Sequence, residues 1–346
     1  MPDTISLTEM GWQPFFQQQI SLDELDSVTP ARVVEHHKSK IEIYSEQGRQ
    51  TLPITSSTPA LTVGDWVLQK REDGRISRVL ERQSCFRRKA AGRQAIEQLL
   101  AANVDTAFIV CSLNDDFNLN RIERYLSVVN DAGAEPVVVL TKMDLCAQAD
   151  ELREQVQQLD SQLCVEMVNG KDSDSTKALL PWCRSGQTVV ALGSSGAGKS
   201  TLTNSLVGEQ IQATAEIRED DEKGRHTTTH RSLLSIPGGA MIIDTPGMRE
   251  LQLADCEAGV STTFADIEEL AIQCRFSDCQ HQSEPGCAVQ AALRAEELDQ
   301  RRFDNYGKLL REQELNAASI AERRAAGKNL GKLYKSAKEA KYGKKV

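Results

Sequence analysis

The stretch TVVALGSSGAGKSTLTNSL, residues 188–206, decides the fold of this chain. It starts as an apolar strand-type segment, passes through a glycine-rich turn and continues as a helix-type segment. Residues 193–200 fit the pattern G-x-x-x-x-G-K-[ST], whose backbone N–H groups wrap around a phosphate at the start of a helix. In this setting the pattern predicts a nucleoside triphosphate site. The residues of the predicted site are Gly193, Ser194, Ser195, Gly196, Ala197, Gly198, Lys199, Ser200 and Thr201.

Two side chains of this loop have predicted chemical roles. Lys199 would bridge the β- and γ-phosphates and take part in catalysis, and the Ser200 hydroxyl would bind Mg²⁺. The alternative is a glycine-rich strand-to-helix turn without a ligand. That alternative leaves the complete set of fixed positions unexplained.

The segments around the loop predict an α/β domain over residues 104–255. Strand-type segments occupy 104–112, 135–141 and 163–168, and helix-type segments occupy 118–133, 150–162 and 176–185. Continuous Val, Ile and Leu in such strands are typical of a parallel sheet covered by helices on both faces.

A four-residue motif ends the segment 135–144, where Thr141, Lys142, Met143 and Asp144 fit [NT]-K-x-D. The Asp144 carboxylate can accept hydrogen bonds from guanine N1–H and the 2-amino group, and adenine has no donor at either place. Thr141 and Lys142 would brace the loop and stack along the base. Alone, the motif could equally be a strand-end loop with a salt-bridged lysine. Together with the phosphate loop, it predicts GTP and GDP as the ligands.

Asp244 and Gly247 fit a third motif, D-x-x-G, after the strand-type segment 240–244. Asp244 would hold Mg²⁺ through water, and the N–H of Gly247 would meet the γ-phosphate. The next residue is Met248, where many switch GTPases have a glutamine that orients the attacking water. Another residue must therefore orient that water.

A switch loop is predicted at GRHTTTH, residues 224–230. One of its threonines would complete the Mg²⁺ shell; Thr228 is favoured, and Thr227 and Thr229 stay open. His226 is the nearest polar candidate to orient or deprotonate the water, and we assign it a catalytic role beside Thr228. The alternatives are a threonine-rich strand entry and a histidine that only packs within its loop.

The order of these motifs along the chain is unusual. GTPase domains usually run from the phosphate loop through the switch threonine and D-x-x-G to the guanine motif, whereas here the guanine motif comes first. The sequence thus predicts a circularly permuted domain, which is allowed because the ends of compact α/β domains are often close. The segment after Gly247 then runs directly toward the C-terminal part and could transmit the nucleotide state to it.

The N-terminal part predicts a small β domain over residues 31–84. Residues 1–30 lack periodicity and contain acidic but no basic residues, so we expect a loose arm. Short strand-type segments separated by turn signals lie at 31–35, 40–45, 50–54, 64–70 and 76–81. Five strands at this spacing indicate a small barrel or sandwich. Residues 85–103 begin with a basic stretch and are expected to form a linker.

A cluster of metal-ligand residues lies at Cys274, Cys279, His281 and Cys287. Three thiolates and one imidazole are the ligand set of a closed tetrahedral zinc site, with no position left for a catalytic water. We expect one structural zinc ion that stabilises a helical domain over residues 256–346. The alternative is a set of unpaired buried cysteines.

Composition and charge narrow the class of protein. Of 346 residues, 40% are hydrophobic and 26% are charged, which excludes a disordered or fibrous chain. Nine cysteines, no leader-like start and no apolar run of about 20 residues predict a reduced, cytoplasmic protein without membrane contact. Residues 321–346 form a basic tail with nine basic and two acidic residues, although the whole chain has a net charge of −9. The tail predicts contact with a polyanion; the alternative is a solvated helical end that aids solubility.

The motifs TKMD, GSSGAGKST, GRHTTT and DTPG in this order, with a small β domain before them and FSDCQHQSEPGCAV after them, resemble the ribosome small-subunit-dependent GTPase family, also called ribosome biogenesis GTPase A. The resemblance implies an OB-fold barrel, a circularly permuted GTPase domain and a zinc-binding helical domain. It also implies late maturation of the small ribosomal subunit as the role, with GTP hydrolysis stimulated by that subunit. The chain departs from the family pattern at Asn169, Gly170 and Lys171, which replace the usual base-side S-A motif, and in its acidic arm.

Two other function classes compete with this interpretation. A P-loop kinase acting on a small molecule would leave the guanine motif and the β domain unexplained. An RNA-binding protein with a vestigial nucleotide site would leave the intact Lys199, Ser200 and Asp244 unexplained. We therefore expect a monomeric GTP-hydrolysing switch that binds the small ribosomal subunit and its rRNA.

Overall fold

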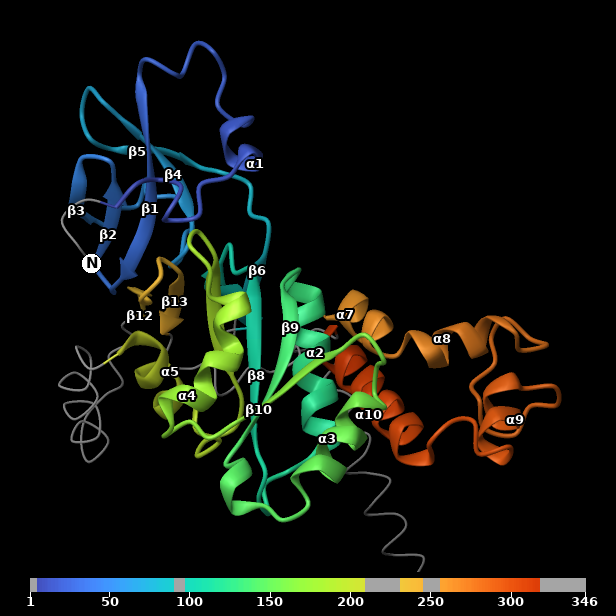
Figure 1. The fold of residues 1–346 in the computed structure, drawn as a ribbon. Coiled ribbons are helices and arrows are strands. Elements are labelled where there is room, and N and C mark those ends of the chain that lie inside the picture. Colours follow the sequence, from blue (N-terminus) through green and yellow to red (C-terminus); the bar gives the residue numbers. More distant parts are fainter. Residues whose placement is uncertain (1–4, 90–96, 209–230, 245–255, 318–346) are drawn as a thin grey trace, which may run out of the picture.

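The computed structural model describes residues 5–89, 97–208, 231–244 and 256–317. Within these ranges the chain forms a β-rich N-terminal part, a central sheet flanked by helices, and a group of helices on the C-terminal side (Figure 1). None of the helices in these ranges has the length and apolar character needed to cross a membrane.

The central sheet consists mainly of parallel strands. In spatial order they are β10 (Cys164–Val168), β9 (Glu135–Thr141), β8 (Thr106–Ser112), β11 (Thr188–Leu192), β13 (Met241–Asp244) and β12 (Arg231–Ser235), and β12 runs antiparallel to β13. The predicted parallel sheet is confirmed. Because parallel strands end at the same edge, the ends of β9, β11 and β13 bring Thr141, Gly193 and Asp244 to one edge of the sheet.

Helices connect these strands. They are α2 (Leu119–Ala132), α3 (Ala149–Gln157), α4 (Ser173–Thr176) and α5 (Lys199–Val207), with the 3₁₀ helices η1 (Met143–Leu145) and η2 (Lys177–Trp182). The helix expected over 176–185 is instead the short α4 followed by η2. Pro181 lies inside η2 and has no backbone N–H to donate, which disfavours a regular α-helix there.

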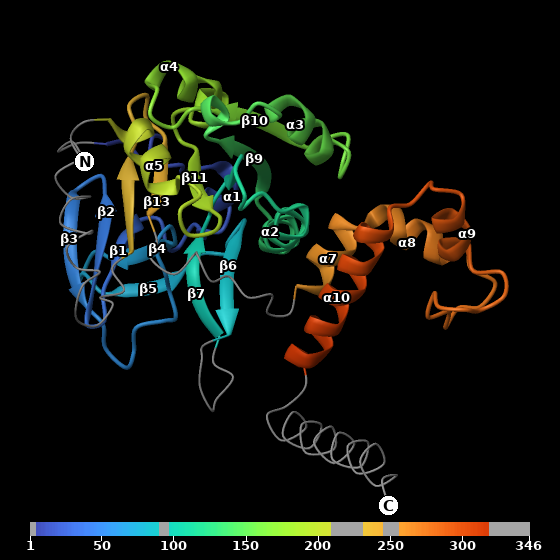
Figure 2. The same ribbon diagram turned by 90° about the horizontal axis from the view of Figure 1, so that it is seen from below.

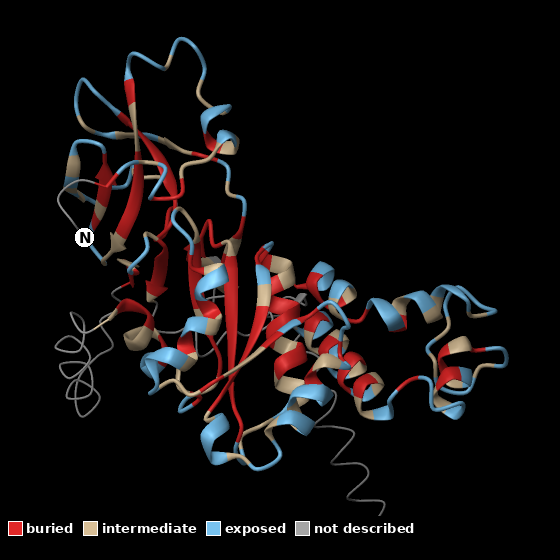
Figure 3. Cartoon of the chain, viewed as in Figure 1, coloured by how far each residue is buried: buried red, intermediate tan, exposed pale blue. Residues whose placement is uncertain are grey.

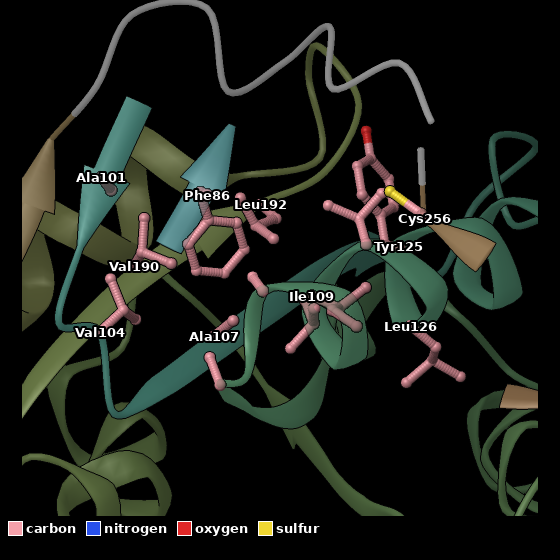
Figure 4. Packing of buried hydrophobic residues seen from close by; sticks show 14 of the residues in the cluster. Phe86, Ala101, Val104, Ala107, Ile109, Tyr125, Leu126, Val190, Leu192 and Cys256 are labelled. Atoms are coloured by element: carbon pink, nitrogen blue, oxygen red, sulfur yellow. The ribbon is translucent and has the colours of Figure 1, made fainter. Parts of the chain in front are cut away.

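The sheet buries a hydrophobic core on each face. Ile109 of β8 packs in one cluster with Tyr125 and Leu126 of α2, as Figure 4 shows, whereas Phe108 of the same strand belongs to the cluster that contains Leu202 of α5. This alternation follows from the two-residue period of a strand. The central strands β8 and β11 are therefore buried along almost their whole length (Figure 3).

The N-terminal strands form a barrel-like β region. They are β1 (Val28–His36), β2 (Lys40–Ser45), β3 (Gly48–Pro53), β4 (Trp66–Lys70) and β5 (Ile76–Val79), each at a predicted position. Antiparallel pairing runs β3-β2-β1-β4-β5. The N-terminal part is thus a barrel-like β region built from the five predicted strands.

The barrel-like region is joined to the central sheet. β1 pairs with β12 at its end, so both regions belong to one continuous sheet. The buried Arg32 also crosses this junction, because its guanidinium donates to the carbonyl of Asn103 at 3.1 Å and to Thr188 Oγ1 at 2.8 Å. Burial lowers the pKa of Arg32 to about 10.

The segment before β1 is packed, which corrects the expectation of a loose arm. The helix α1 (Pro14–Gln17) and its neighbours bury Met10 and Phe16, and the Trp12 ring meets Trp66 edge-on at 4.8 Å between centroids. Burial of these large apolar side chains lowers the free energy of the folded chain. The segment therefore packs although its sequence lacks a helical or strand periodicity.

Residues 85–103, expected as a linker, contain a hairpin of β6 (Cys85–Lys89) and β7 (Glu97–Ala102). Phe86 and Leu100 are buried and join the core on the α2 side of the sheet. The sequence predicted a linker here because residues 87 and 88 are both basic. A strand, however, needs apolar side chains on only one of its faces.

A group of helices forms the C-terminal part, and the first and the last of them lie beside α2 (Figure 2). The helices are α7 (Glu257–Thr263), α8 (Ala265–Ile272), α9 (Ala288–Arg294) and α10 (Gln300–Ala317). α7 packs closely on α2 at Gly259, where an added Cβ would come within 2.0 Å of the carbonyl oxygen of Ser127. A turn in which Glu296 has a φ of 57° separates α9 from α10.

Candidate functional site

The phosphate loop connects β11 to α5, as the sequence predicted. Gly193 begins the loop with a φ of 144°, and a Cβ there would come within 2.2 Å of the carbonyl oxygen of Val110. Only glycine allows the loop to pass this close to β8. The helix α5 starts at Lys199, so the N–H groups of its first turn point toward the loop.

Lys199 folds back over the phosphate loop. Its Nζ donates to the carbonyl oxygens of Gly193 at 2.8 Å and Ser194 at 2.5 Å. Ser200 is exposed at the start of the helix. The ammonium group and the helix N-terminus give this loop a positive potential suited to an anionic ligand.

The guanine motif is bonded to the phosphate loop. Thr141 is buried at the end of β9, and its Oγ1 donates to the carbonyl oxygen of Ala197 at 2.6 Å. Lys142 follows with a φ of 60°, and η1 then presents Met143 and Asp144 to solvent. A hydrogen bond between residues 56 positions apart in the chain thus joins the two motifs to each other.

The loop at Asn169, Gly170 and Lys171 lies against α5, the helix that follows the phosphate loop. The carbonyl oxygen of Gly170 accepts from Ser205 Oγ at 2.6 Å, and a Cβ on Gly170 would lie 3.6 Å from the side chain of Thr201. This loop follows β10, which neighbours β9. Although it lacks the S-A residues of the family pattern, the segment therefore lies beside the helix that follows the phosphate loop.

The D-x-x-G motif is described only in part. Asp244 ends β13 and is half-buried, beside the strand that leads into the phosphate loop. Several predicted residues and the basic tail lie outside the described residues: His226, Thr227, Thr228, Thr229, Gly247, Met248 and residues 321–346.

One residue of the site escaped the sequence analysis. Asp116, in the loop between β8 and α2, accepts from Ser194 Oγ at 2.6 Å and from the Arg121 guanidinium at 2.6 Å. Hydrogen bonds from Arg121 and Ser194 lower the pKa of Asp116. The only signal in the sequence was a polar loop at the end of a strand that neighbours the phosphate-loop strand.

The Cys/His cluster forms a compact set of ligand atoms. His281 Nδ1 lies 3.6 Å from Cys274 Sγ and 3.5 Å from Cys287 Sγ, and these two sulfurs are 3.8 Å apart. All four ligand atoms, including Cys279 Sγ, lie within 4.8 Å of one another. A tetrahedral zinc ion with Zn–S of about 2.3 Å and Zn–N of about 2.0 Å requires ligand separations of about 3.5–3.8 Å. The cluster fits a zinc ion.

Comparison with known proteins now decides the family. The profile of the RsgA GTPase matches residues 79–254. The chain is 59% identical over 327 residues to the Small ribosomal subunit biogenesis GTPase RsgA 2 of Vibrio parahaemolyticus, which covers 94% of this chain and 91% of that relative. The chain belongs to the RsgA GTPase family. This RsgA-family chain is therefore a GTP-hydrolysing enzyme, and the resemblance seen in its motifs is confirmed.

Solved structures confirm the permuted fold of this RsgA-family chain. The crystal structure of YjeQ from Thermotoga maritima matches with a TM-score of 0.62 and 26% identity, over 82% of this chain and 98% of that one. YloQ, described as a circularly permuted GTPase, matches with a TM-score of 0.58 and 22% identity, over 83% of this chain and 95% of that one. The likeness to YloQ concerns the fold alone.

Proposed function

We propose that this RsgA-family chain is a GTP-dependent switch in late maturation of the small ribosomal subunit, and that binding to the subunit stimulates its GTPase activity. The observation that carries the proposal is the bond from Thr141 to Ala197, which joins a guanine motif to a phosphate loop in one site. The name of the Vibrio relative, a small ribosomal subunit biogenesis GTPase, supports the choice of partner.

The phosphate loop would bind the nucleotide. Its N–H groups and Lys199 would hold the β- and γ-phosphates, and the ammonium would exchange its bonds to Gly193 and Ser194 for phosphate oxygens. Asp144 would recognise the guanine edge from its exposed position beside the loop. These contacts fix the γ-phosphate in place for attack by water.

Ser200, Thr228 and Asp244 would hold Mg²⁺. When bound, the ion would neutralise charge on the β- and γ-phosphates. His226 would orient the attacking water or accept its proton, since Met248 has no polar group for that purpose. An isolated loop rarely holds such geometry, so docking on the subunit would accelerate hydrolysis by ordering it.

The other parts of the chain would contact ribosomal RNA. Barrels of this kind often bind nucleic acid, and the tail 321–346 carries nine basic residues. The C-terminal helices, stabilised by zinc, are attached to the GTPase domain through α2 and would move with the nucleotide state. We place the protein in the cytoplasm as a monomer.

Sedimentation with purified small subunits tests this proposal. The full chain should cosediment when a non-hydrolysable GTP analogue is bound and dissociate with GDP, because a switch binds its partner in one nucleotide state. Equal cosedimentation in both states, or none in either state, would contradict the proposed switch. Large subunits serve as the control particle, and we expect no binding to them.

A further inference from the structure

The loop between β8 and α2 reaches the phosphate loop through one carboxylate. Asp116 Oδ2 accepts from Ser194 Oγ at 2.6 Å, and Asp116 Oδ1 accepts from Arg121 at 2.6 Å. Both oxygens are therefore engaged, one by the second residue of the phosphate loop and the other by the first turn of α2. The nucleotide-binding motifs do not include this residue.

The loop that carries Asp116 is itself held in shape. Asn114 Oδ1 accepts from Ser112 Oγ at 2.7 Å and from the backbone N–H of Asp116 at 3.2 Å. Asn118 then caps α2 by accepting from the N–H of Arg121 at 3.1 Å. The carboxylate thus projects from a braced turn between a buried strand and a capped helix, so its position is fixed before any ligand binds.

The charges around Asp116 favour a strong bond to the loop. Arg121 forms an ion pair with it, and the positive charge of Lys142 in the guanine motif also acts on it. A hydrogen bond to an ionised acceptor is stronger than one between neutral groups. The neighbouring cations also offset the repulsion that a lone carboxylate would exert on a phosphate.

We propose that Asp116 is a positioning residue of the nucleotide site, which acts through Ser194 to hold the phosphate loop in the conformation that binds a phosphate. The inference rests on the proposed nucleotide role of this loop. A loop with three glycines loses much conformational entropy on binding, and a fixed contact in the free protein reduces that loss. Because the loop surrounds the β-phosphate, the contact should affect GDP and GTP alike.

A double-mutant cycle in the full chain tests this role. We expect Asp116→Ala and Ser194→Ala each to raise the dissociation constants for GDP and GTP by about tenfold, as expected for a charge-assisted hydrogen bond. The double variant should bind about as weakly as either single variant, because both changes remove the same bond. Asp116→Asn keeps an acceptor oxygen and should recover part of the affinity. Asp73→Asn, in the barrel-like region, is the control and should bind like the wild type.

Two results of the binding measurements would overturn the proposal. One is unchanged nucleotide affinity in Asp116→Ala; the other is an equal loss from Asp116→Ala in the wild type and in the Ser194→Ala background. Thermal unfolding without nucleotide is measured for each variant, and a loss of affinity that merely follows a lower melting temperature also counts against positioning. Failure of the wild type to bind guanine nucleotides would instead refute the proposed function of the site.

Discussion

Glu123 should be essential for the attachment of the C-terminal helices to the GTPase domain. It lies on α2 with no exposed surface, and its carboxylate accepts from Arg301 at 2.9 Å, from Arg302 at 2.8 Å and from Asn305 at 2.5 Å. All three donors belong to α10. Glu123→Gln keeps the shape of the side chain but removes its charge, so the buried guanidinium of Arg302 loses one of its two carboxylate partners.

The size of the effect follows from burial. Breaking a buried ion pair by removing one partner costs about 3–5 kcal/mol. Here the cost should lie near the lower end, at about 3 kcal/mol, because Arg302 keeps its bonds to Asp266 and the Arg301 side chain is 30% exposed. We expect this loss mainly in the free energy that holds α10 on α2.

Native-state hydrogen exchange measures that free energy. Amides of α10 should exchange about 150-fold faster in Glu123→Gln, the factor that corresponds to about 3 kcal/mol. Glu312→Gln is a matched control, since Glu312 also pairs with α2, at Arg124, but both side chains are partly exposed. Its effect should stay below about 1 kcal/mol. Equal exchange rates in the two variants would refute the assignment of the buried pair as the main attachment.

Three further predictions concern the site. Asp144→Asn should weaken GTP binding and favour xanthosine triphosphate, whose 2-oxo group needs a donor; competition assays measure this, and equal affinity of the wild type for ATP and GTP would contradict it. One equivalent of zinc should copurify with the chain, and Cys279→Ala should unfold the C-terminal helices while nucleotide binding persists; metal analysis that finds no zinc in reduced protein refutes the site. His226→Ala should lose subunit-stimulated turnover but keep GTP affinity and subunit binding; full stimulation in the variant would exclude the histidine.

The local pattern of the sequence was enough for much of the fold. Continuous apolar strands that alternate with helices predicted the parallel sheet, and the phosphate loop predicted the turn before α5, because period and glycine placement are local properties. The spacing of Cys274, Cys279, His281 and Cys287 likewise predicted a cluster, since residues close in sequence can meet with little chain rearrangement.

Contacts between distant segments could not be predicted in this way. The packing of Trp12 on Trp66 and the pairing of β6 with β7 depend on tertiary partners, which overrode weak local signals. Asp116 is a similar case: its role depends on β8 lying beside β11, and no spacing rule links it to Ser194. The buried Glu123 also looks like an ordinary helix-surface charge until α10 covers it.

The most direct test of the central claim is phosphate release from GTP by the full chain, with and without purified small ribosomal subunits. We predict slow phosphate release by the chain alone and strong acceleration by small subunits. Large subunits should not accelerate the release from GTP, and small subunits should not accelerate release from ATP. Lys199→Ala should be inactive in every condition, because it lacks the ammonium for the β- and γ-phosphates. A wild-type rate that small subunits leave unchanged, or a rate that Lys199→Ala retains, would contradict the account.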